Sequence, residues 1–351
     1  MDADEVPPRP DLAYVRRRRV YRCRRCKGVK VSDLALPTSV LALVVAVLSM
    51  AAPAFGQSTS EFPRIPWASA SVRALGLGGA YQLGASRADA VFYHPAVVNG
   101  GARGFGAQLQ FWSGDAVQAT LAAARSWHGG TVALGVNSLR ISDYTVVPLS
   151  AHHSWSPVGS HVSPVDLGQG EIIRGGGSGA STLSVHLGYA RELGPLDIGV
   201  TTKLAEEGLG SARWREPLVD LGVSTELVGV TVAASYQNLG REKLNAEPRR
   251  MRVGLGRYGI QAGPLDLGFA GELSVLGSAT IPAGGVEVGY WPVSGRTFVA
   301  RAGLRRVVAG GASPVTLGFS FWGDEIALEW GFQPVDWAEA GGTHRFGLAW
   351  R

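Results

Sequence analysis

Cysteine is almost absent from this chain of 351 residues, since both of its cysteines, Cys23 and Cys26, lie near the N-terminus. A structural zinc site needs a second pair of ligands, so this single Cys-x-x-Cys pair does not predict one. The remainder of the chain has no cysteine and is expected to fold without a disulfide, even in an oxidising compartment. The apolar run from Val40 through Leu48 is also shorter than the ~20 residues that span a bilayer as a helix.

The first 56 residues have the order of a Sec-type signal peptide. A basic stretch that includes Arg16–Arg19 precedes the apolar run, and small residues then lead to Gly56 and Gln57. We expect cleavage near Gly56 and export of the chain to the cell outer membrane. The alternatives are an uncleaved anchor and a true start further downstream, at Val29 or Val31.

An excess of positive charge is missing from the part that follows the leader. Residues 1–56 hold 10 of the 33 basic and 5 of the 28 acidic residues, which leaves 23 of each. A neutral mature chain lacks the basic surface on which nucleic-acid binding depends. We therefore expect no nucleic-acid partner.

What the chain does contain is a long series of segments with alternating hydrophobicity. Leu265, Leu267 and Phe269 alternate with Asp266 and Gly268, and a period of two places them on opposite faces of a sheet. Fourteen such segments are predicted, at 105–113, 116–127, 131–142, 180–191, 196–207, 217–225, 228–238, 250–260, 265–276, 284–292, 297–305, 314–322, 325–333 and 343–351. No long amphipathic helix is predicted after Gly101.

The connections between these segments alternate in length. Short turns are predicted near 128–130, 193–195, 227, 262–264, 293–296 and 323–324, and longer loops at 143–179, 208–216, 239–249, 277–283, 306–313 and 334–342. Short periplasmic turns, longer outer loops, an even strand number and strands of ~9–11 residues are typical of transmembrane barrels. We predict an all-β fold, a transmembrane antiparallel β-barrel of about 14 strands over residues 104–351.

Tryptophan gives this interpretation further support. Trp112, Trp127, Trp291 and Trp322 fall at predicted strand ends, where aromatic girdles form in outer-membrane barrels. The alternative is a soluble β protein whose core holds these rings. A sandwich of about 300 residues and fourteen strands would be large for that class.

A segment rich in small residues precedes the first strand and is predicted to fill the barrel as a plug, over residues 57–103. It contains the runs RALGLGGAY (Arg73–Tyr81) and ADAVFYHPA (Ala88–Ala96). These runs resemble the opening segment of the PorV/PorQ family, outer-membrane barrels related to the FadL-type transporters of hydrophobic compounds. His94 stands where that family usually has Asn. The candidate plug and gating residues are Arg73, Gly76, Gly78, Gly79, Asp89, Tyr93, His94 and Pro95.

Charged residues on the polar side of the strands form a second candidate set. Their position in the alternating pattern of each strand places them inside the barrel. There they would either form ion pairs that satisfy their charge and fix the plug, or line a polar conduit. They are Asp197, Lys203, Asp220, Arg252, Asp266, Glu272, Glu287, Arg301, Arg305 and Glu329.

Motifs of catalysis and cofactor binding are weak. The Gly-x-Gly-x-x-Gly match at Gly254–Gly259 is followed by a strand and lacks the helix that holds a pyrophosphate. His152, His153 and His161 have no metal-site spacing, and His186 has no serine and carboxylate partners recognisable from spacing. We expect no enzyme activity, no catalytic residue, no metal and no cofactor.

Two functions remain in competition, with an outer-membrane hydrolase as a weaker third. The resemblance implies either a barrel that binds or passes a hydrophobic small molecule, or a type IX-like secretion accessory that binds secreted protein cargo. Outer-membrane lipid and the barrel-assembly machinery are the further expected partners.

Overall fold

The computed structural model describes residues 69–81, 88–100, 104–111, 116–141, 180–209, 212–240, 249–276, 279–293, 296–306, 313–334 and 342–350. The predicted signal peptide and cleavage site, the rest of the plug, Trp112 and the three loop histidines lie outside these ranges. Among the described residues, no helix is long and apolar enough to cross a membrane.

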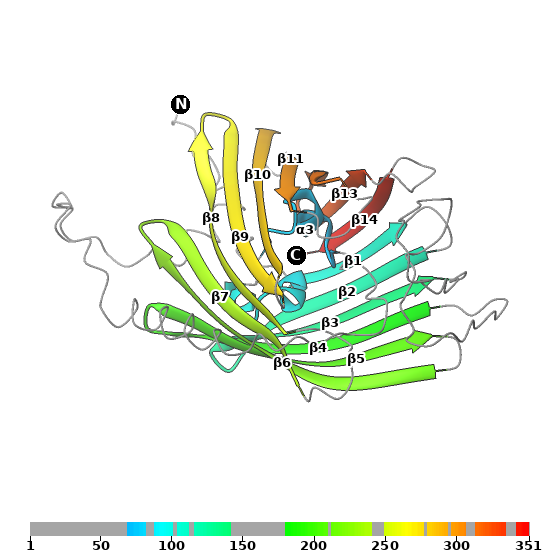
Figure 1. The fold of residues 1–351 in the computed structure, drawn as a ribbon. Helices are drawn as coiled ribbons and strands as arrows, with labels where there is room; N and C mark the ends of the chain where they lie inside the picture. Colours follow the sequence, from blue (N-terminus) through cyan, green and yellow to red (C-terminus); the bar gives the residue numbers. More distant parts are fainter. Residues whose placement is uncertain are drawn as a thin grey trace, which may run out of the picture.

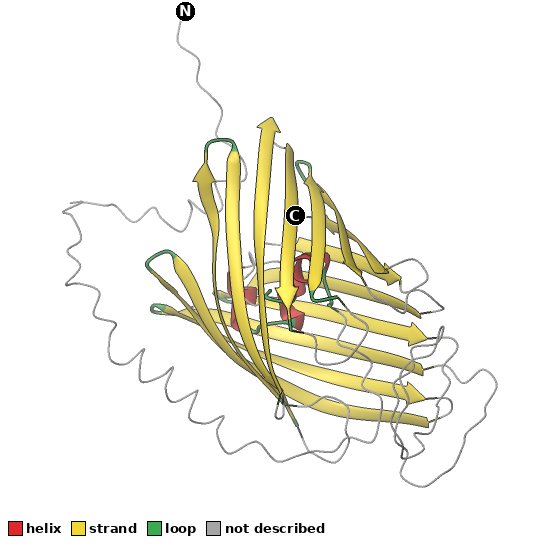
Figure 2. Ribbon diagram, turned by 45° about the horizontal axis from the view of Figure 1, so that its top comes forward, coloured by secondary structure: helices red, strands yellow, loops and turns green. Residues whose placement is uncertain are grey.

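The described chain forms fourteen antiparallel strands that close into one barrel (Figures 1 and 2). They are β1 (Gly104–Phe111), β2 (Ala116–Trp127), β3 (Gly130–Ile141), β4 (Ala180–Leu193), β5 (Leu196–Leu209), β6 (Ala212–Leu227), β7 (Val230–Leu239), β8 (Arg250–Ala262), β9 (Leu265–Leu276), β10 (Ala279–Val293), β11 (Arg296–Arg305), β12 (Val315–Trp322), β13 (Ile326–Pro334) and β14 (Gly342–Trp350). Each strand pairs with its neighbours in sequence, and β1 pairs with β14 to close the sheet. Every predicted segment corresponds to one strand, so the predicted fold class is confirmed.

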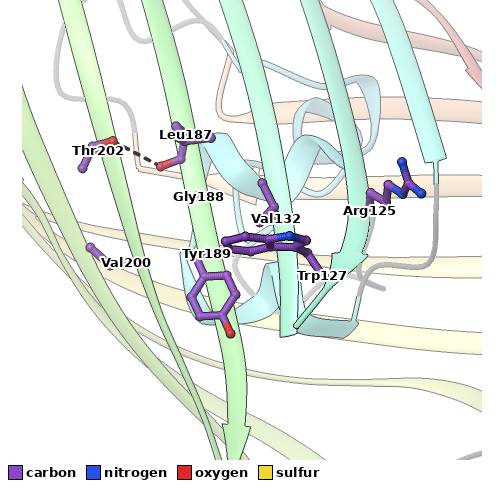
Figure 3. A pocket seen from close by; sticks show the side chains of 8 residues that line it. All are labelled: Arg125, Trp127, Val132, Leu187, Gly188, Tyr189, Val200 and Thr202. Carbon is purple, nitrogen blue, oxygen red and sulfur yellow. Dashed lines mark hydrogen bonds between the residues drawn. The ribbon is translucent and has the colours of Figure 1, made fainter. Parts of the chain in front are cut away.

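The two faces of this sheet differ sharply in chemistry. Along β12, Leu317 and Phe319 are exposed on the outer face, while Thr316 and Ser320 are buried on the inner face. The outer face carries most of the exposed large apolar side chains, and Figure 3 shows a part of it on β2–β5. An apolar exterior around a polar interior is the arrangement of a barrel whose solvent is lipid. The chain therefore has the fold of an outer-membrane β-barrel.

Tight turns join the strands at one end of the barrel. His128 and Gly129 join β2 to β3 with φ of 44° and 74°, and Val228 and Gly229 join β6 to β7 with φ of 51° and 76°. Two residues with positive φ are typical of a type I′ hairpin, whose twist matches that of the strands. Since short turns mark the periplasmic side of such barrels, this end is assigned to the periplasm.

Two predicted long loops are wrong. Residues 208–216 and 277–283 were expected to be loops, yet β5 runs to Leu209, β6 starts at Ala212, and β10 starts at Ala279 directly after β9. β5 and β6 extend beyond their apolar stretch because polar side chains pair across them, as Arg215 Nε and Glu206 Oε2 do at 2.6 Å. The start of β10 is strand because its backbone pairs with β9 from Ala279 onward. Trp322 also differs from expectation, since it is buried beside Val299 and Ala327 and does not lie in an outer girdle.

Three short helical segments lie inside the barrel, as both ribbon views show (Figures 1 and 2). They are α3 (Val72–Gly76), η3 (Ala88–Phe92) and η4 (Ala96–Gly100). The helix α3 begins at Ser71, whose side chain caps it by accepting a hydrogen bond from the Ala74 amide. It ends before Gly78 and Gly79, which have φ of 67° and 90°.

Candidate functional site

The internal segment, residues 69–81 and 88–100, is called the plug below. Its first half packs α3 against β11–β14, and its second half packs η3 and η4 against β1–β6. The two halves of the plug therefore contact two different sets of wall strands.

Glycines of the inner wall allow the first half of the plug to approach closely. A Cβ added at Gly303 would lie 2.0 Å from the Gly78 amide nitrogen, and one at Gly285 would lie 2.7 Å from Leu77 Cα. Gly76 and Gly318 face each other in the same way, since a Cβ added at either one would lie 3.1 Å from the Cα atom of the other. Any larger residue at these wall positions would push the plug backbone away.

The second half of the plug uses the same device. A Cβ at Gly199 would lie 2.4 Å from the Pro95 carbonyl, and one at Gly222 would lie 2.8 Å from the His94 ring. Within the described residues, plug contacts of this kind involve nine wall glycines: Gly135, Gly188, Gly199, Gly222, Gly285, Gly303, Gly318, Gly331 and Gly347. The abundance of inward-facing glycine in the sequence therefore reflects the fit of the plug.

A buried charge network fixes the first half. Arg73 Nη2 lies 2.9 Å from Glu287 Oε1, and the other oxygen of Glu287 lies 2.6 Å from Arg301 Nε. The Arg73 guanidinium also lies over the Tyr258 ring, 4.7 Å from its centroid. Two cations thus share one carboxylate inside the barrel, and loss of that carboxylate would remove from both the ion pair that helps to offset their desolvation.

A second anchor of this half was missed by sequence reasoning. Arg345 on β14 is fully buried and donates to the side chains of Gln108, Gln110, Gln118 and Thr120 and to the Ser69 carbonyl. Gln108 also accepts a hydrogen bond from the Val72 amide at 2.7 Å, so the cluster ties the start of α3 to the wall. The sequence does carry a signal for this cluster. Its polar residues alternate with apolar neighbours along the strands, which places them on the inner face of the barrel.

Tyrosines connect the two halves of the plug. The Tyr93 hydroxyl accepts a hydrogen bond from the Ser71 amide at 2.8 Å, and its ring packs edge-on to Tyr81 at 4.8 Å. Tyr81 in turn donates to Asp89 at 2.8 Å. This contact joins Asp89 in the second half of the plug to Tyr81 in the first. Burial raises the pKa of the Tyr93 phenol to about 12, so the hydroxyl stays protonated.

His94 lies deep in the second half. Its Nε2 lies 2.9 Å from the Ala234 carbonyl of β7, and its Nδ1 has no hydrogen-bond partner among the described residues. Burial, aided by the charge of Arg252, lowers the pKa of His94 to about 4. The imidazole is therefore neutral between pH 5 and 8, with Nε2–H as the donor.

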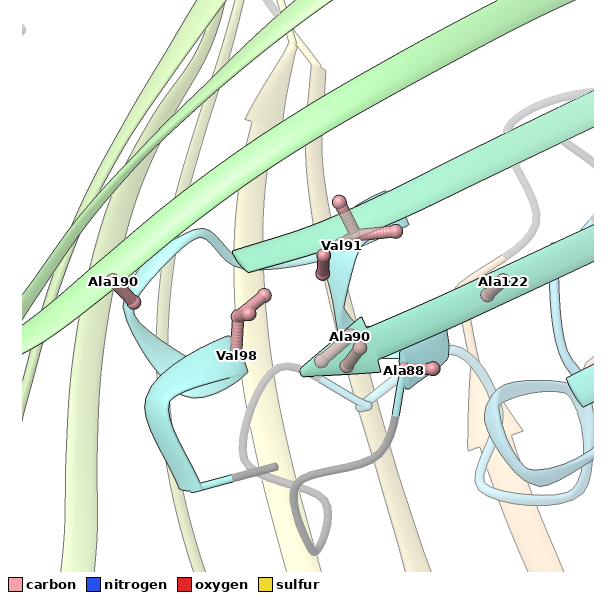
Figure 4. Close-up of a cluster of buried hydrophobic side chains, with 8 residues drawn as sticks. Ala88, Ala90, Val91, Val98, Ala122 and Ala190 are labelled. Atoms are coloured by element: carbon pink, nitrogen blue, oxygen red, sulfur yellow. The ribbon is translucent and has the colours of Figure 1, made fainter. Parts of the chain in front are cut away.

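Apolar contacts complete the second half. Ala88, Ala90, Val91 and Val98 of η3 and η4 pack against Ala122, Ala124, Ala133 and Ala190 of the wall (Figure 4). Here the wall residues are small, and the contact is made by apolar side chains.

The predicted inner-wall charges divide into pairs and single contacts. Lys203 Nζ lies 3.1 Å from Asp220 Oδ1, and Arg252 Nη1 lies 3.5 Å from Glu272 Oε1. Three further members make hydrogen bonds to neutral side chains: Asp197 accepts from Asn99, Arg305 donates to Gln333, and Glu329 accepts from Ser320. Asp266 is half-buried.

The structure also gives His186 a neighbour that spacing did not reveal. Its Nε2 lies 3.0 Å from Ser184 Oγ, two residues earlier on β4, and the Phe92 ring of the plug packs edge-on at 5.0 Å. Because the plug covers this pair, a substrate would reach it only after plug movement. The described residues contain no cluster of three or more side chains suited to a metal ion.

No protein-family model matches the chain, and no curated protein does. Among solved structures, the Pseudomonas putida toluene transporter TodX is 9% identical, covering 83% of this chain and 98% of that one, with a TM-score of 0.48. The CymD monoaromatic hydrocarbon channel is 10% identical, covering 80% and 97%, with a TM-score of 0.46. The outer membrane protein Omp33 of Acinetobacter baumannii is 12% identical, covering 71% and 98%, with a TM-score of 0.38. Likeness at this level assigns neither a family nor a ligand, so membership of the PorV/PorQ family stays a prediction.

Proposed function

We propose that this chain is a non-enzymatic, plugged outer-membrane channel of PorV/PorQ and FadL-like type that binds or passes a small hydrophobic molecule. The observation that carries the proposal is a closed barrel whose interior holds residues 69–81 and 88–100. Passage through such a barrel requires the plug to move, so the segment Arg73 to Pro95 controls access.

The surface between plug and wall supports a hydrophobic ligand. Five buried plug residues form an apolar and aromatic cluster: Ala70, Ala74, Leu77, Tyr81 and Tyr93. Phe92 and Tyr258 pack against this cluster. This cluster lies inside the barrel, next to the polar side chains of the inner wall. Ligand pockets are lined mainly by apolar and aromatic side chains with a few polar groups that orient the ligand. Arg73 and Asp89 border the cluster and supply such groups.

Uptake by whole cells tests the proposal. Cells whose outer membrane is rich in lipopolysaccharide would express the chain, and the initial uptake rate of a radiolabelled small aromatic hydrocarbon would be compared with that of vector-only cells. We expect faster uptake with the wild type. Tyr258→Ala, which removes a ring from the apolar cluster, should alter the rate, and Gly271→Ala, where an added Cβ meets nothing within 4 Å, should not.

A second measurement distinguishes the proposed channel from the alternative, a secretion accessory that binds protein cargo. Detergent-solubilised protein would be isolated by affinity and analysed for bound lipid and bound protein. Unchanged hydrocarbon uptake together with a reproducibly co-isolated secreted protein would reject the channel proposal in favour of a cargo-binding role.

A further inference from the structure

The outer face of the barrel has a groove that the proposed channel does not use. It lies on β2–β5 close to the short-turn end, has a volume of about 540 Å³, and is lined mainly by apolar atoms. Its wall includes Trp127, Val132, Leu187, Tyr189 and Val200 (Figure 3). Trp127, Leu187 and Val200 are exposed on the side of the sheet that faces lipid.

Strand register explains why the wall is hollow here. Arg125, Val132, Tyr189 and Val200 form one row across four strands, because each is paired with the next. In the adjacent row Trp127 is paired with Gly130, which has no side chain to separate the tryptophan from β4. The Tyr189 ring occupies that space, since a Cβ at Gly130 would lie 2.8 Å from its hydroxyl, and the two rings meet edge-on at 6.1 Å.

Position and charge together indicate the occupant. Trp127 is the last residue of β2 before the turn, at the level where tryptophan and tyrosine meet lipid headgroups. Arg125 lies two residues further into the membrane on the same outer face, and no carboxylate of the described chain lies within ion-pair distance of it. A guanidinium on a lipid-facing wall is costly, and its planar set of donors fits a phosphate.

We propose that this groove binds one phospholipid of the inner leaflet, with an acyl chain against Trp127, Leu187 and Val200 and the phosphate at Arg125. The proposal rests on the barrel and its lipid-facing side and is independent of transport. The bound lipid would be distinguished from ordinary surrounding lipid by slower exchange, because one site supplies both an anion partner and an apolar groove.

Native mass spectrometry of the full chain, released from detergent, tests this with phosphatidylglycerol and with diacylglycerol of the same acyl chains. Wild type should retain one phosphatidylglycerol. Arg125→Gln should weaken phosphatidylglycerol binding about tenfold, as loss of a charge-assisted hydrogen bond implies, and leave diacylglycerol binding unchanged. Trp127→Ala should weaken the binding of both lipids.

Two control variants lie on the same outer face but away from the groove. Arg257→Gln and Tyr290→Ala remove an exposed arginine and a 46% exposed tyrosine, and both should bind as wild type does. Equal loss in the controls, or equal retention of phosphatidylglycerol in wild type and Arg125→Gln, would overturn the proposal. Preferential retention of diacylglycerol by the wild type would overturn the assignment of the phosphate to Arg125.

Discussion

The two halves of the plug occupy one barrel but are held by different forces. Around α3 the contacts are charged, since Arg73 shares Glu287 with Arg301, and Arg345 reaches the start of the helix. Around η3 and η4 alanine and valine packing dominates, with hydrogen bonds such as those from Gln237 to the Tyr93 carbonyl and from Asn99 to Asp197. Both halves rest on wall glycines.

This difference has a consequence for how the plug could open. A competing charge can replace one partner of a buried ion pair, and loss of a partner leaves an uncompensated buried charge, whereas apolar packing offers no such exchangeable partner. If the plug gates the channel as proposed, the charged half would act as a latch that a competing ion or ligand could release. The neutral half provides the attachment that keeps the segment inside the barrel.

Removing both halves at once should have the largest effect. A chain lacking residues 70–96 should still insert as a barrel, because the strand pairing does not involve these residues. Its conductance in planar bilayers should rise well above that of the wild type, and its mobility on gels should still change on boiling. Normal insertion with unchanged conductance and unchanged ligand or partner binding would show that this segment is not a plug.

The second largest effect is expected when only the charged half of the plug is disrupted. Glu287→Gln removes the carboxylate that contacts both Arg73 and Arg301 and leaves two buried cations close together. Breaking a buried pair in this way costs about 3–5 kcal/mol. We expect frequent opening in single-channel records and faster proteolysis of the plug.

The matched change in the neutral half is Gln237→Met, which removes the hydrogen bond to Tyr93 and adds no charge. Its cost should be about 1–3 kcal/mol, the penalty for one unsatisfied buried carbonyl. Equal opening in Glu287→Gln and Gln237→Met would contradict the distinction between the two halves.

Replacing a wall glycine with valine tests the two halves of the plug separately. Gly303→Val would place its Cβ 2.0 Å from the Gly78 nitrogen, and Gly199→Val would place its Cβ 2.4 Å from the Pro95 carbonyl. Overpacking of this kind costs about 1–3 kcal/mol, so each change should loosen its own half. Protease cleavage sites mapped by mass spectrometry would show which half is released. Gly271→Val, at an open position, is the control and should behave as wild type.

The strands could be predicted from the sequence because lipid on one side and a polar interior on the other impose a period of two. That rule fails at the strand ends, and the described residues of the expected loops at 208–216 and 277–283 are strand, because β5 continues to pair with β6 there and β10 with β9. Beyond the bilayer, pairs such as Glu206 and Arg215 hold the sheet, and their polarity resembles that of a loop.

The site was less predictable, because its contacts join residues far apart in sequence. Parity placed Arg301 and Glu287 on one face, but only the closed barrel brings them to Arg73. Arg345 was overlooked since its acceptors, the glutamines of β1 and β2, are neutral and carry no charge pattern. Ser184 beside His186 was equally hidden, as serine is common on inner walls.

The smallest expected effect concerns pH and the neutral half. An exposed histidine changes charge between pH 5 and 8, but burial lowers the pKa of His94 to about 4 while the plug is seated. Once exposed, its pKa would return to about 6.5. A lowered pKa means that the exposed state binds the proton more tightly, so the seated plug is fully stable above pH 6.5 and loses stability as pH falls toward 4.

Conductance measured between pH 4 and 8 tests this. The wild type should be unchanged from pH 8 to 7, and opening should increase below pH 6.5, corresponding to about 1–2 kcal/mol by pH 5–6. His94→Asn keeps a hydrogen-bond donor without a titrating ring, so it should insert normally and lose this dependence. An equal acid response in His94→Asn would assign it to the carboxylates of the charged half, Glu287 first among them, and would make that latch the pH-sensitive part of the plug.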